Sequence, residues 1–497
     1  MSRYDVVIIG SGLGGLACGA VLSKEGFRVC VLEKNQLPGG CFQSFRRHGR
    51  LLDTGIHYIG SMDEGEILRH YFSYFGILDQ LKMRRMEEEA FDLIYYQGKA
   101  YPYAMGHTRF IETLSREFPK ERENIRRYAE ALCAVGASIG REQLCRGKFS
   151  AGTLDNFSIS AWDRVCSFTS DPVLRQVLSG SVLLYGGNRS VSTFYHHAII
   201  TNSYLQGAWR LVDGSMQVTD ALAGVIRQNG GTVLTNAEAT ALCVTGDKIG
   251  AVEVNRSERL ESRYVISSLH PAVTLGLVEK NTLIRKATLS RLQALPYSYG
   301  FFSVYLLQKP GTTVYENRNY FVIGENDAWY ATARPDDTRV TTCMISMQPS
   351  SASPLYTDVV CLLCPMYFSE VERWRDTTPG RRGAAYEEFK ERKARELIAF
   401  AERYYPGLSS HTEHVVTTTP LSYRDYTGTP GGSAYGIVKD CKNPLVSLVP
   451  VRTRISNLLL TGQNLNVHGA LGVTLTAMRT CGELIGTDYL AKKIGNI

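Results

Sequence analysis

The chain has 497 residues, of which 44% are hydrophobic and 21% are charged, and its formal net charge is +7. This composition is typical of a globular protein with two or three domains, and it excludes a disordered chain. The basic residues are dispersed, so no nucleic-acid partner is expected. No run of about 20 apolar residues predicts a membrane-spanning helix, no signal-peptide pattern is present, and twelve cysteines form no repeating framework. We therefore expect a cytoplasmic protein.

Residues 4–33 predict a strand, a glycine turn, a helix and a second strand. An apolar run over residues 6–9 leads into the letters GSGLGG, and another apolar run covers residues 28–32. Glycines in such a turn allow a tight bend, a close approach to a pyrophosphate and close packing of helix on strand. The helix N-terminus offers free N–H groups to the phosphates. We assign this role to Gly10, Gly12, Gly14 and Gly15.

Glu33 follows the second predicted strand, 18 residues after Gly15. A carboxylate at this place can accept hydrogen bonds from both hydroxyls of an adenosine ribose, and it would repel a 2′-phosphate. We assign Lys34, the next residue, to the same nucleotide site. The segment therefore predicts an NAD or FAD site and disfavours NADP.

The remaining elements alternate between helical and strand patterns. The pair Cys361 and Cys364 falls in a predicted buried strand, where side chains three apart point to opposite faces, so no metal site is expected. Helices are predicted over most of residues 67–137, with a break at Pro119 and a strand pair at 91–103. Further helices are predicted at 212–228, at 383–404 and after residue 469. Further strands are predicted at 264–271, 300–307 and 457–461.

Several segments together resemble the phytoene desaturase-like family of FAD-dependent oxidoreductases, and within it the retinol saturase branch. The resemblance covers residues 4 to about 485. It rests on YDVVIIGSGLGGLACG, PGGCFQSF with GRLLDTGIHYIG, LVDGSMQVTDAL, VISSLHP, TPLSYRDYTGTPGGSAYG and LLLTGQNLNVHGALGVTLTA. Cys41 stands where many relatives carry an arginine, and this departure favours the saturase-like branch.

The resemblance implies FAD as cofactor and redox chemistry on carbon–carbon double bonds of a long apolar polyene or isoprenoid, such as a retinoid or carotenoid. It implies an α/β fold, in which a Rossmann-like FAD-binding domain of the glutathione reductase or amine oxidase type is interwoven with a mixed α+β substrate domain. The FAD-binding domain would comprise residues 1–85, 206–275 and 411–497, and the substrate domain residues 86–205 and 276–410.

The same resemblance assigns further residues to the cofactor. The glycine doublet would let backbone reach the phosphates or the ribityl chain, and a strand residue would contact adenine through its backbone. The C-terminal loop would pass close to the flavin ring, and the helix after it would direct its positive dipole end at the ring. These residues are Gly39 and Gly40 in the doublet, Ala239 at the adenine, Gly462 and Gln463 in the loop, and Gly472 and Val473 in the helix.

Hydride chemistry at a double bond also needs a group that moves a proton. We expect His57, Tyr58 and His468 to be the catalytic candidates, with His196 and His197 next, because a neutral imidazole can donate or accept near pH 7. Aromatic residues on the predicted strands could line an apolar tunnel. These are Phe301, Phe302, Tyr305, Tyr320, Phe321, Trp329 and Tyr330.

Two other functions stay open at this point: an FAD amine oxidase-like enzyme acting on a small substrate, and a non-redox prenyl-binding escort protein. The sequence contains no second dinucleotide fingerprint and no ferredoxin-type cysteine run. We therefore expect a separate electron donor or acceptor beside the apolar substrate, together with peripheral membrane contact. The sequence leaves the substrate, the direction of the reaction and the oligomeric state open.

Overall fold

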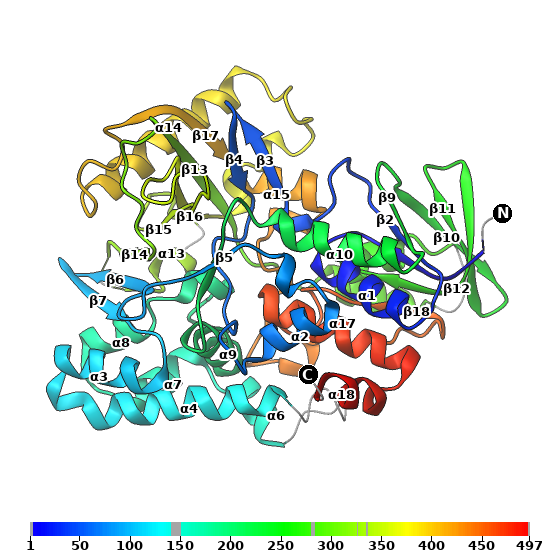
Figure 1. The fold of residues 1–497 in the computed structure, drawn as a ribbon, viewed down its shortest axis with the longest axis horizontal. Coiled ribbons are helices and arrows are strands. Elements are labelled where there is room, and N and C mark those ends of the chain that lie inside the picture. The colour runs from blue at the N-terminus through cyan, green and yellow to red at the C-terminus, as the bar shows by residue number, and fades with distance from the viewer. Residues whose placement is uncertain (1–2, 141–150, 280–283, 326, 334–335, 496–497) are drawn as a thin grey trace.

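The computed structural model describes residues 3–140, 151–279, 284–325, 327–333 and 336–495. Two large β-sheets form the centres of two halves that lie side by side (Figure 1). The chain crosses between these halves several times, so each half is built from segments far apart in the sequence. The predicted α/β fold is confirmed.

The first sheet carries the glycine turn. Its strand order is β10-β11-β12-β1-β2-β9, with β18 paired to β12. The pairs β12–β1, β1–β2, β2–β9 and β12–β18 are parallel, and helices α1 (Leu13–Lys24), α10 (Met216–Gln228) and α17 (Gly469–Ile485) pack beside them. The strands are β1 (Arg3–Ile9), β2 (Val29–Leu32), β9 (Thr232–Leu234), β10 (Ala239–Thr245), β11 (Lys248–Val254), β12 (Glu258–Ser267) and β18 (Leu458–Leu460).

The second sheet has the order β17-β13-β16-β15-β14-β6-β7 and is antiparallel except for the pair β14–β6. Its central strands are buried on both faces, and α14 (Ala384–Glu402) covers one face. Cys361 packs in the core on one side of β16 and Cys364 in the core on the other, as predicted. The strands are β6 (Asp92–Tyr96), β7 (Lys99–Tyr103), β13 (Gly300–Gln308), β14 (Asn319–Ile323), β15 (Thr342–Met347), β16 (Val359–Met366) and β17 (Thr412–Thr418).

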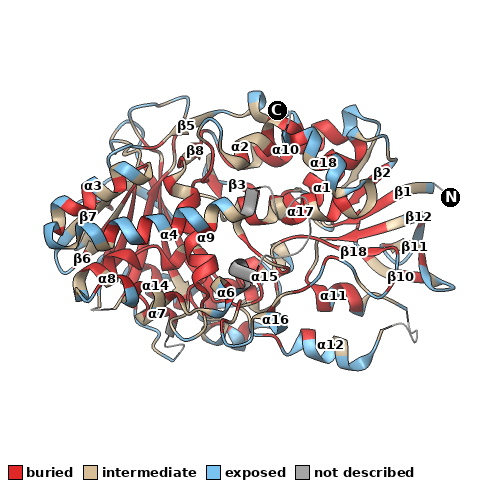
Figure 2. Cartoon of the chain, turned by 90° about the horizontal axis from the view of Figure 1, so that it is seen from below, coloured by how far each residue is buried: buried red, intermediate tan, exposed pale blue. Residues whose placement is uncertain are grey.

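Helices surround both sheets, with their exposed faces outward (Figure 2). They are α1 (Leu13–Lys24), α2 (Ile67–Phe75), α3 (His107–Glu117), α4 (Arg122–Gly140), α6 (Ala151–Ser158), α7 (Ala161–Phe168), α8 (Pro172–Leu178), α9 (Phe194–Leu205), α10 (Met216–Gln228), α11 (Pro271–Gly276), α12 (Lys286–Gln293), α13 (Tyr330–Ala333), α14 (Ala384–Glu402), α15 (Pro420–Thr427), α16 (Pro444–Ser447), α17 (Gly469–Ile485) and α18 (Thr487–Gly495). Two small two-stranded sheets are also present: the hairpin of β3 (Ser44–Arg47) with β4 (Arg50–Asp53), and the antiparallel pair of β5 (Met83–Arg85) with β8 (Trp209–Leu211), which are far apart in the chain.

Local chemistry explains where the predicted elements begin and end. The helical pattern around Pro119 divides into α3 and α4, because proline cannot continue a helix interior. The helix predicted from residue 212 begins only at Met216, since Asp213 and Gly214 have φ values of 65° and 99°. The two-domain division stays a proposal. In it we would now group β17 with the second sheet, because β17 pairs with β13.

Candidate active site

The glycine turn between β1 and α1 forms one wall of a cavity, which we call the first cavity. Gly10 has a φ of +90°, and a Cβ on Gly15 would lie 2.0 Å from the Gly10 carbonyl oxygen, so neither position accepts a side chain without a shift of backbone. A Cβ on Gly12 would meet nothing within 4 Å, because Gly12 faces the open cavity. Bare backbone therefore faces the place where a pyrophosphate is expected.

Glu33 lies at the end of β2 and lines the first cavity. Its carboxylate already accepts hydrogen bonds from the Ser11 backbone N–H at 3.2 Å, the Ser11 hydroxyl at 2.5 Å and the Asn35 backbone N–H at 2.9 Å. The carboxylate thus holds the glycine turn in place, and its remaining lone pairs are left for a ribose hydroxyl. Lys34 also lines this cavity, and its Nζ donates to the Asp425 carbonyl at 3.1 Å.

Ten of the thirteen residues assigned to the cofactor from the sequence line the first cavity. Gly15, Gly39 and Gly472 do not; each is packed against neighbouring chain, and the Gly39 N–H donates to the Ser11 carbonyl at 3.1 Å. The ten lining residues are Gly10, Gly12, Gly14, Glu33, Lys34, Gly40, Ala239, Gly462, Gln463 and Val473.

The first cavity continues into a second one at the start of α17. Five residues line both cavities: Cys41, Ile56, Gln463, Gly469 and Ala470. The N-terminal end of α17 therefore lies at the junction, where its unpaired N–H groups and positive dipole end favour an electron-rich group. Its first turn contains no acidic side chain that would cancel this field.

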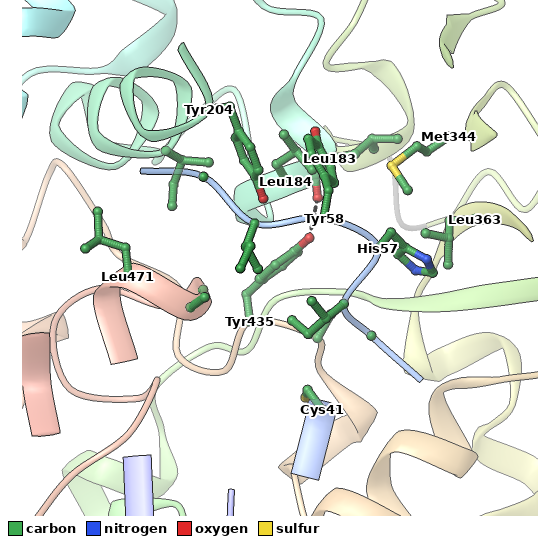
Figure 3. A pocket seen from close by; sticks show the side chains of 18 of the residues that line it. Cys41, His57, Tyr58, Leu183, Leu184, Tyr204, Met344, Leu363, Tyr435 and Leu471 are labelled. Carbon is green, nitrogen blue, oxygen red and sulfur yellow. Dashed lines mark hydrogen bonds between the residues drawn. The ribbon is translucent and has the colours of Figure 1, made fainter. Parts of the chain in front are cut away.

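The second cavity lies against the second sheet and the start of α17, and Figure 3 shows the side chains that line it. Its walls come from the segment after β4, from α9, from β13, β15 and β16, and from the loop that carries Tyr435. Apart from the five shared residues, the lining is Gly55, His57, Tyr58, Ile59, Gly60, Leu183, Leu184, Ile200, Ser203, Tyr204, Phe301, Met344, Leu363, Tyr423, Ala434, Tyr435 and Leu471.

His57 and Tyr58, two of the proton-handling candidates from the sequence, both line the second cavity. Both ring nitrogens of His57 are buried and have no hydrogen-bond partner among the described residues. Burial and the nearby Arg210 charge lower the pKa of His57 to about 4, so its imidazole is neutral at pH 7. The Tyr58 hydroxyl, by contrast, is used: it donates to Asp92 Oδ2 at 2.9 Å.

Asp92 belongs to a buried polar chain that sequence reasoning did not identify. Its Oδ1 accepts from Asn319 Nδ2 at 2.9 Å, and Asn319 Oδ1 accepts from Arg210 Nη2 at 2.8 Å. Burial raises the pKa of the Asp92 carboxyl to about 7, although the Asn319 and Tyr58 bonds and the Arg210 charge oppose this shift. Asp92 and Arg210 come from strands far apart in the chain, so only the folded structure reveals this link.

His468 is not in the second cavity. It precedes α17, its Nε2 interacts with the Tyr185 carbonyl at 3.2 Å, and its ring packs against Tyr435 and His196. Burial lowers the pKa of His468 to about 3. His196 has both ring nitrogens occupied, by Thr193 Oγ1 at 2.7 Å and the Asn466 carbonyl at 2.9 Å. The structure therefore separates His468 from His57 and Tyr58.

The loop before His468 is held by a buried lysine. Lys439 Nζ donates to the carbonyl oxygens of Ser447, Asn464 and Leu465, each at 2.9 Å. Burial lowers the pKa of Lys439 to about 7. Two of these bonds hold the backbone directly after Gln463, which lines both cavities, and the third ties that backbone to the segment of Ser447.

Of the strand aromatics predicted to line a tunnel, Phe301 alone lines the second cavity. Phe302 and Tyr320 point to the opposite face of the sheet and pack in the core beneath α14. The strand period of two explains why Phe301 and Phe302 differ, because neighbouring residues of one strand point to opposite faces of the sheet. Three lining tyrosines were missed by sequence reasoning: Tyr204, Tyr423 and Tyr435.

Comparison with known proteins gives the family. Residues 13–305, more than half of the chain, match the family described as flavin containing amine oxidoreductase. The chain belongs to this family. Its cofactor is FAD, as predicted, and the open backbone at Gly12, the carboxylate of Glu33 and the dipole end of α17 fit the pyrophosphate, ribose and ring in turn.

Similar proteins match this chain over nearly its whole length. The human all-trans-retinol 13,14-reductase is 28% identical over 100% of this chain and 87% of its own length. Prolycopene isomerase 1 of an Oncidium hybrid cultivar is 23% identical over 99% of this chain and 85% of its own. A solved oxidoreductase from Methanosarcina mazei has a TM-score of 0.65 at 17% identity, covering 96% and 99% of the two chains. The predicted resemblance to the phytoene desaturase-like branch is confirmed.

Two features of the described residues concern metal ions and membranes. In that part of the chain, no group of three His, Cys, Asp or Glu side chains is placed to hold a metal ion. Nor does any helix there have the length and apolar character needed to cross a membrane.

Proposed function

We propose that this flavoenzyme acts on carbon–carbon double bonds of a long apolar polyene or isoprenoid, by saturation, desaturation or isomerisation. The observation that carries the proposal is the second cavity, whose lining includes no Asp, Glu, Lys or Arg among the described residues. A hydrocarbon chain gains free energy by burial against such walls, whereas a cationic amine would lose its hydration without finding a carboxylate. The names of the two curated relatives, a retinol reductase and a prolycopene isomerase, support the same substrate class.

The first cavity would hold the cofactor, and the second cavity would hold the substrate. FAD, when bound, supplies hydride transfer between its ring and a substrate carbon. The α17 dipole end at the junction would stabilise negative charge on the ring, and the buried lining of the second cavity would exclude water from the reacting carbons. We propose that His57 and Tyr58 face the substrate and that His468 supports the start of α17.

We also propose that electrons reach or leave the flavin through a separate carrier, since the sequence contains one dinucleotide fingerprint. Because a polyene partitions into lipid, we propose peripheral contact with a membrane. A flotation assay with anionic liposomes checks this: recovery of all the protein in the soluble fraction would contradict the membrane contact.

A polyene panel tests the main proposal. Purified holoprotein, with its flavin reduced or oxidised, is incubated anaerobically with all-trans-retinol, prolycopene and lycopene, and products are identified by chromatography and mass. A gain of two hydrogen atoms reports saturation, a loss of two reports desaturation, and an unchanged mass with altered retention reports isomerisation. The same protein is mixed with putrescine and cyclohexylamine. Rapid flavin reduction by an amine, with no polyene converted, would refute the proposal in favour of an amine oxidase. Protein that stays colourless after FAD is added would favour the escort protein.

A further inference from the structure

Four tyrosines line the second cavity, and their hydroxyls differ in what they contact. Three of the hydroxyls are bonded within the protein and are not free for a substrate. The fourth, that of Tyr204, has no hydrogen-bond partner among the described residues. The three bonded hydroxyls are Tyr58 to Asp92 Oδ2 at 2.9 Å, Tyr423 to the Thr54 carbonyl at 3.1 Å, and Tyr435 to the Leu183 carbonyl at 2.7 Å.

The Tyr204 ring is held in a defined position. It lies in the last turn of α9 and stacks on Tyr58, with ring centroids 4.2 Å apart and an interplanar angle of 26°. Gly60 lets α9 come this close, because a Cβ there would lie 2.5 Å from the Ser203 carbonyl oxygen. Figure 3 shows the hydroxyl of Tyr204 pointing into the cavity. The stacked ring contributes to packing, but its hydroxyl makes no hydrogen bond among the described residues and is therefore available to a substrate carbon in the cavity.

We propose that Tyr204 is the catalytic residue that gives a proton to the substrate when a carbon–carbon double bond is reduced. This inference rests on the proposed function and adds a direction to it. With reduced FAD as the hydride source, one alkene carbon receives a hydride, and the electron pair of the π bond moves to the other carbon. That carbon takes the proton of Tyr204: a C–H bond forms, the O–H bond breaks, and its electron pair stays on the phenolate oxygen. Water that enters as the product leaves returns a proton to the phenolate.

The chemistry of the cavity supports a donor in preference to a base. Burial raises the pKa of Tyr204 above its ordinary value, so the phenol stays protonated at neutral pH. A carbanion is a much stronger base than a phenolate, so the transfer runs downhill. His57 lies at a different wall, beside Met344 and Leu363, and is a weak base with a pKa of about 4. The cavity therefore offers a proton donor, Tyr204, but only a weak base, His57, and this combination favours reduction of a double bond over its formation.

The first test compares Tyr204→Phe with Tyr103→Phe. Tyr103 is buried outside both cavities, and its hydroxyl donates to the Val177 carbonyl at 2.7 Å. Tyr204→Phe should keep the FAD content, the visible spectrum and the melting temperature of the wild type. Its single-turnover rate with reduced flavin and the polyene that the wild type saturates should fall about 100-fold or more. Tyr103→Phe should melt at a lower temperature and react at the wild-type rate.

The second test replaces Tyr204 by a ring-fluorinated tyrosine, which keeps the shape and raises the acidity. A proton donor in the rate-limiting step should then react about threefold faster or more, an effect that a structural tyrosine would not show. A Tyr204→Phe rate within about threefold of the wild type would overturn the assignment, as would an equal loss in both phenylalanine variants. A wild type that reduces no member of the polyene panel would overturn the reductive direction, and one that converts no polyene at all would overturn the proposed function as well.

Discussion

The glycine turn between β1 and α1 predicts that a substitution at Gly12 weakens FAD binding without destabilising the folded apoprotein. Gly12 has φ −63° and ψ 171°, a conformation that alanine adopts without strain, and a Cβ there would meet no protein atom within 4 Å. In Gly12→Ala we therefore expect the apoprotein to melt within about 2 °C of the wild type, because alanine's lower unfolded-state entropy and its poorer capping of α1 nearly cancel. The new methyl group would occupy space needed by the pyrophosphate.

The assay is apoprotein melting with and without FAD, together with an FAD titration. FAD at 100 times its Kd stabilises the wild type by about 2.7 kcal/mol, and Gly12→Ala should lose most of this increment with at least a tenfold weaker Kd. Gly15→Ala is the contrasting variant. Its Cβ would lie 2.0 Å from a backbone oxygen, so the apoprotein itself should be destabilised by about 1–3 kcal/mol. An unchanged Kd in Gly12→Ala, or apoprotein melting several degrees lower, would refute the reasoning.

Three further predictions concern the buried polar groups. Burial raises the pKa of Asp92 from 3.8 to about 7, so the protonated carboxyl stabilises the folded state fully below pH 4. The free energy of unfolding should fall as the pH rises through 7, by about 4 kcal/mol at most. Urea unfolding at pH 5 and pH 8 should show this decrease in the wild type and not in Asp92→Asn. Tyr58→Phe leaves Asp92 Oδ2 without its phenol donor and should lower the free energy of unfolding by about 1–3 kcal/mol, whereas unchanged stability would mean that this bond contributes nothing. Lys439→Met leaves the buried carbonyl oxygens of Ser447 and Asn464 unpaired, while the Leu465 carbonyl keeps the Val449 N–H at 3.1 Å. A melting curve should therefore show a loss of about 2 kcal/mol or more in the free energy of unfolding. An FAD titration should show weaker binding because the loop at Gln463 is released, and a Kd equal to that of the wild type would contradict this second effect.

Most of the lining of the first cavity could be predicted because its signals are local. The glycine turn, the carboxylate after β2 and the glycines around α17 each impose their own backbone conformation, and ten of the assigned residues line the first cavity. His468 shows the limit of this reasoning. Its neighbour Gly469 lines both cavities, but the His468 side chain turns away toward Tyr185, and no local pattern encodes that direction.

The substrate half depends on contacts between distant segments. Tyr204 lies in α9 and stacks on Tyr58 because Gly60 allows the helix to approach. This contact can be predicted only when the tertiary packing of α9 is known. Asp92 is the first residue of β6, and its link to Arg210 through Asn319 joins three separate strands. No periodicity or spacing in the chain predicts such a link, since each residue alone is an ordinary polar residue at a strand.

The second sheet works as a partition with two independent faces. Met344 and Leu363 are direct cross-strand partners and line the second cavity, while their neighbours Ile345 and Leu362 point the other way, into the core beneath α14. Substitutions at alternate positions of β15 and β16 can therefore change the length and width available to a substrate without repacking the far core. In evolution or in design, residues on the cavity face of this sheet can change to suit another substrate, while residues on the face beneath α14 stay the same and maintain the fold.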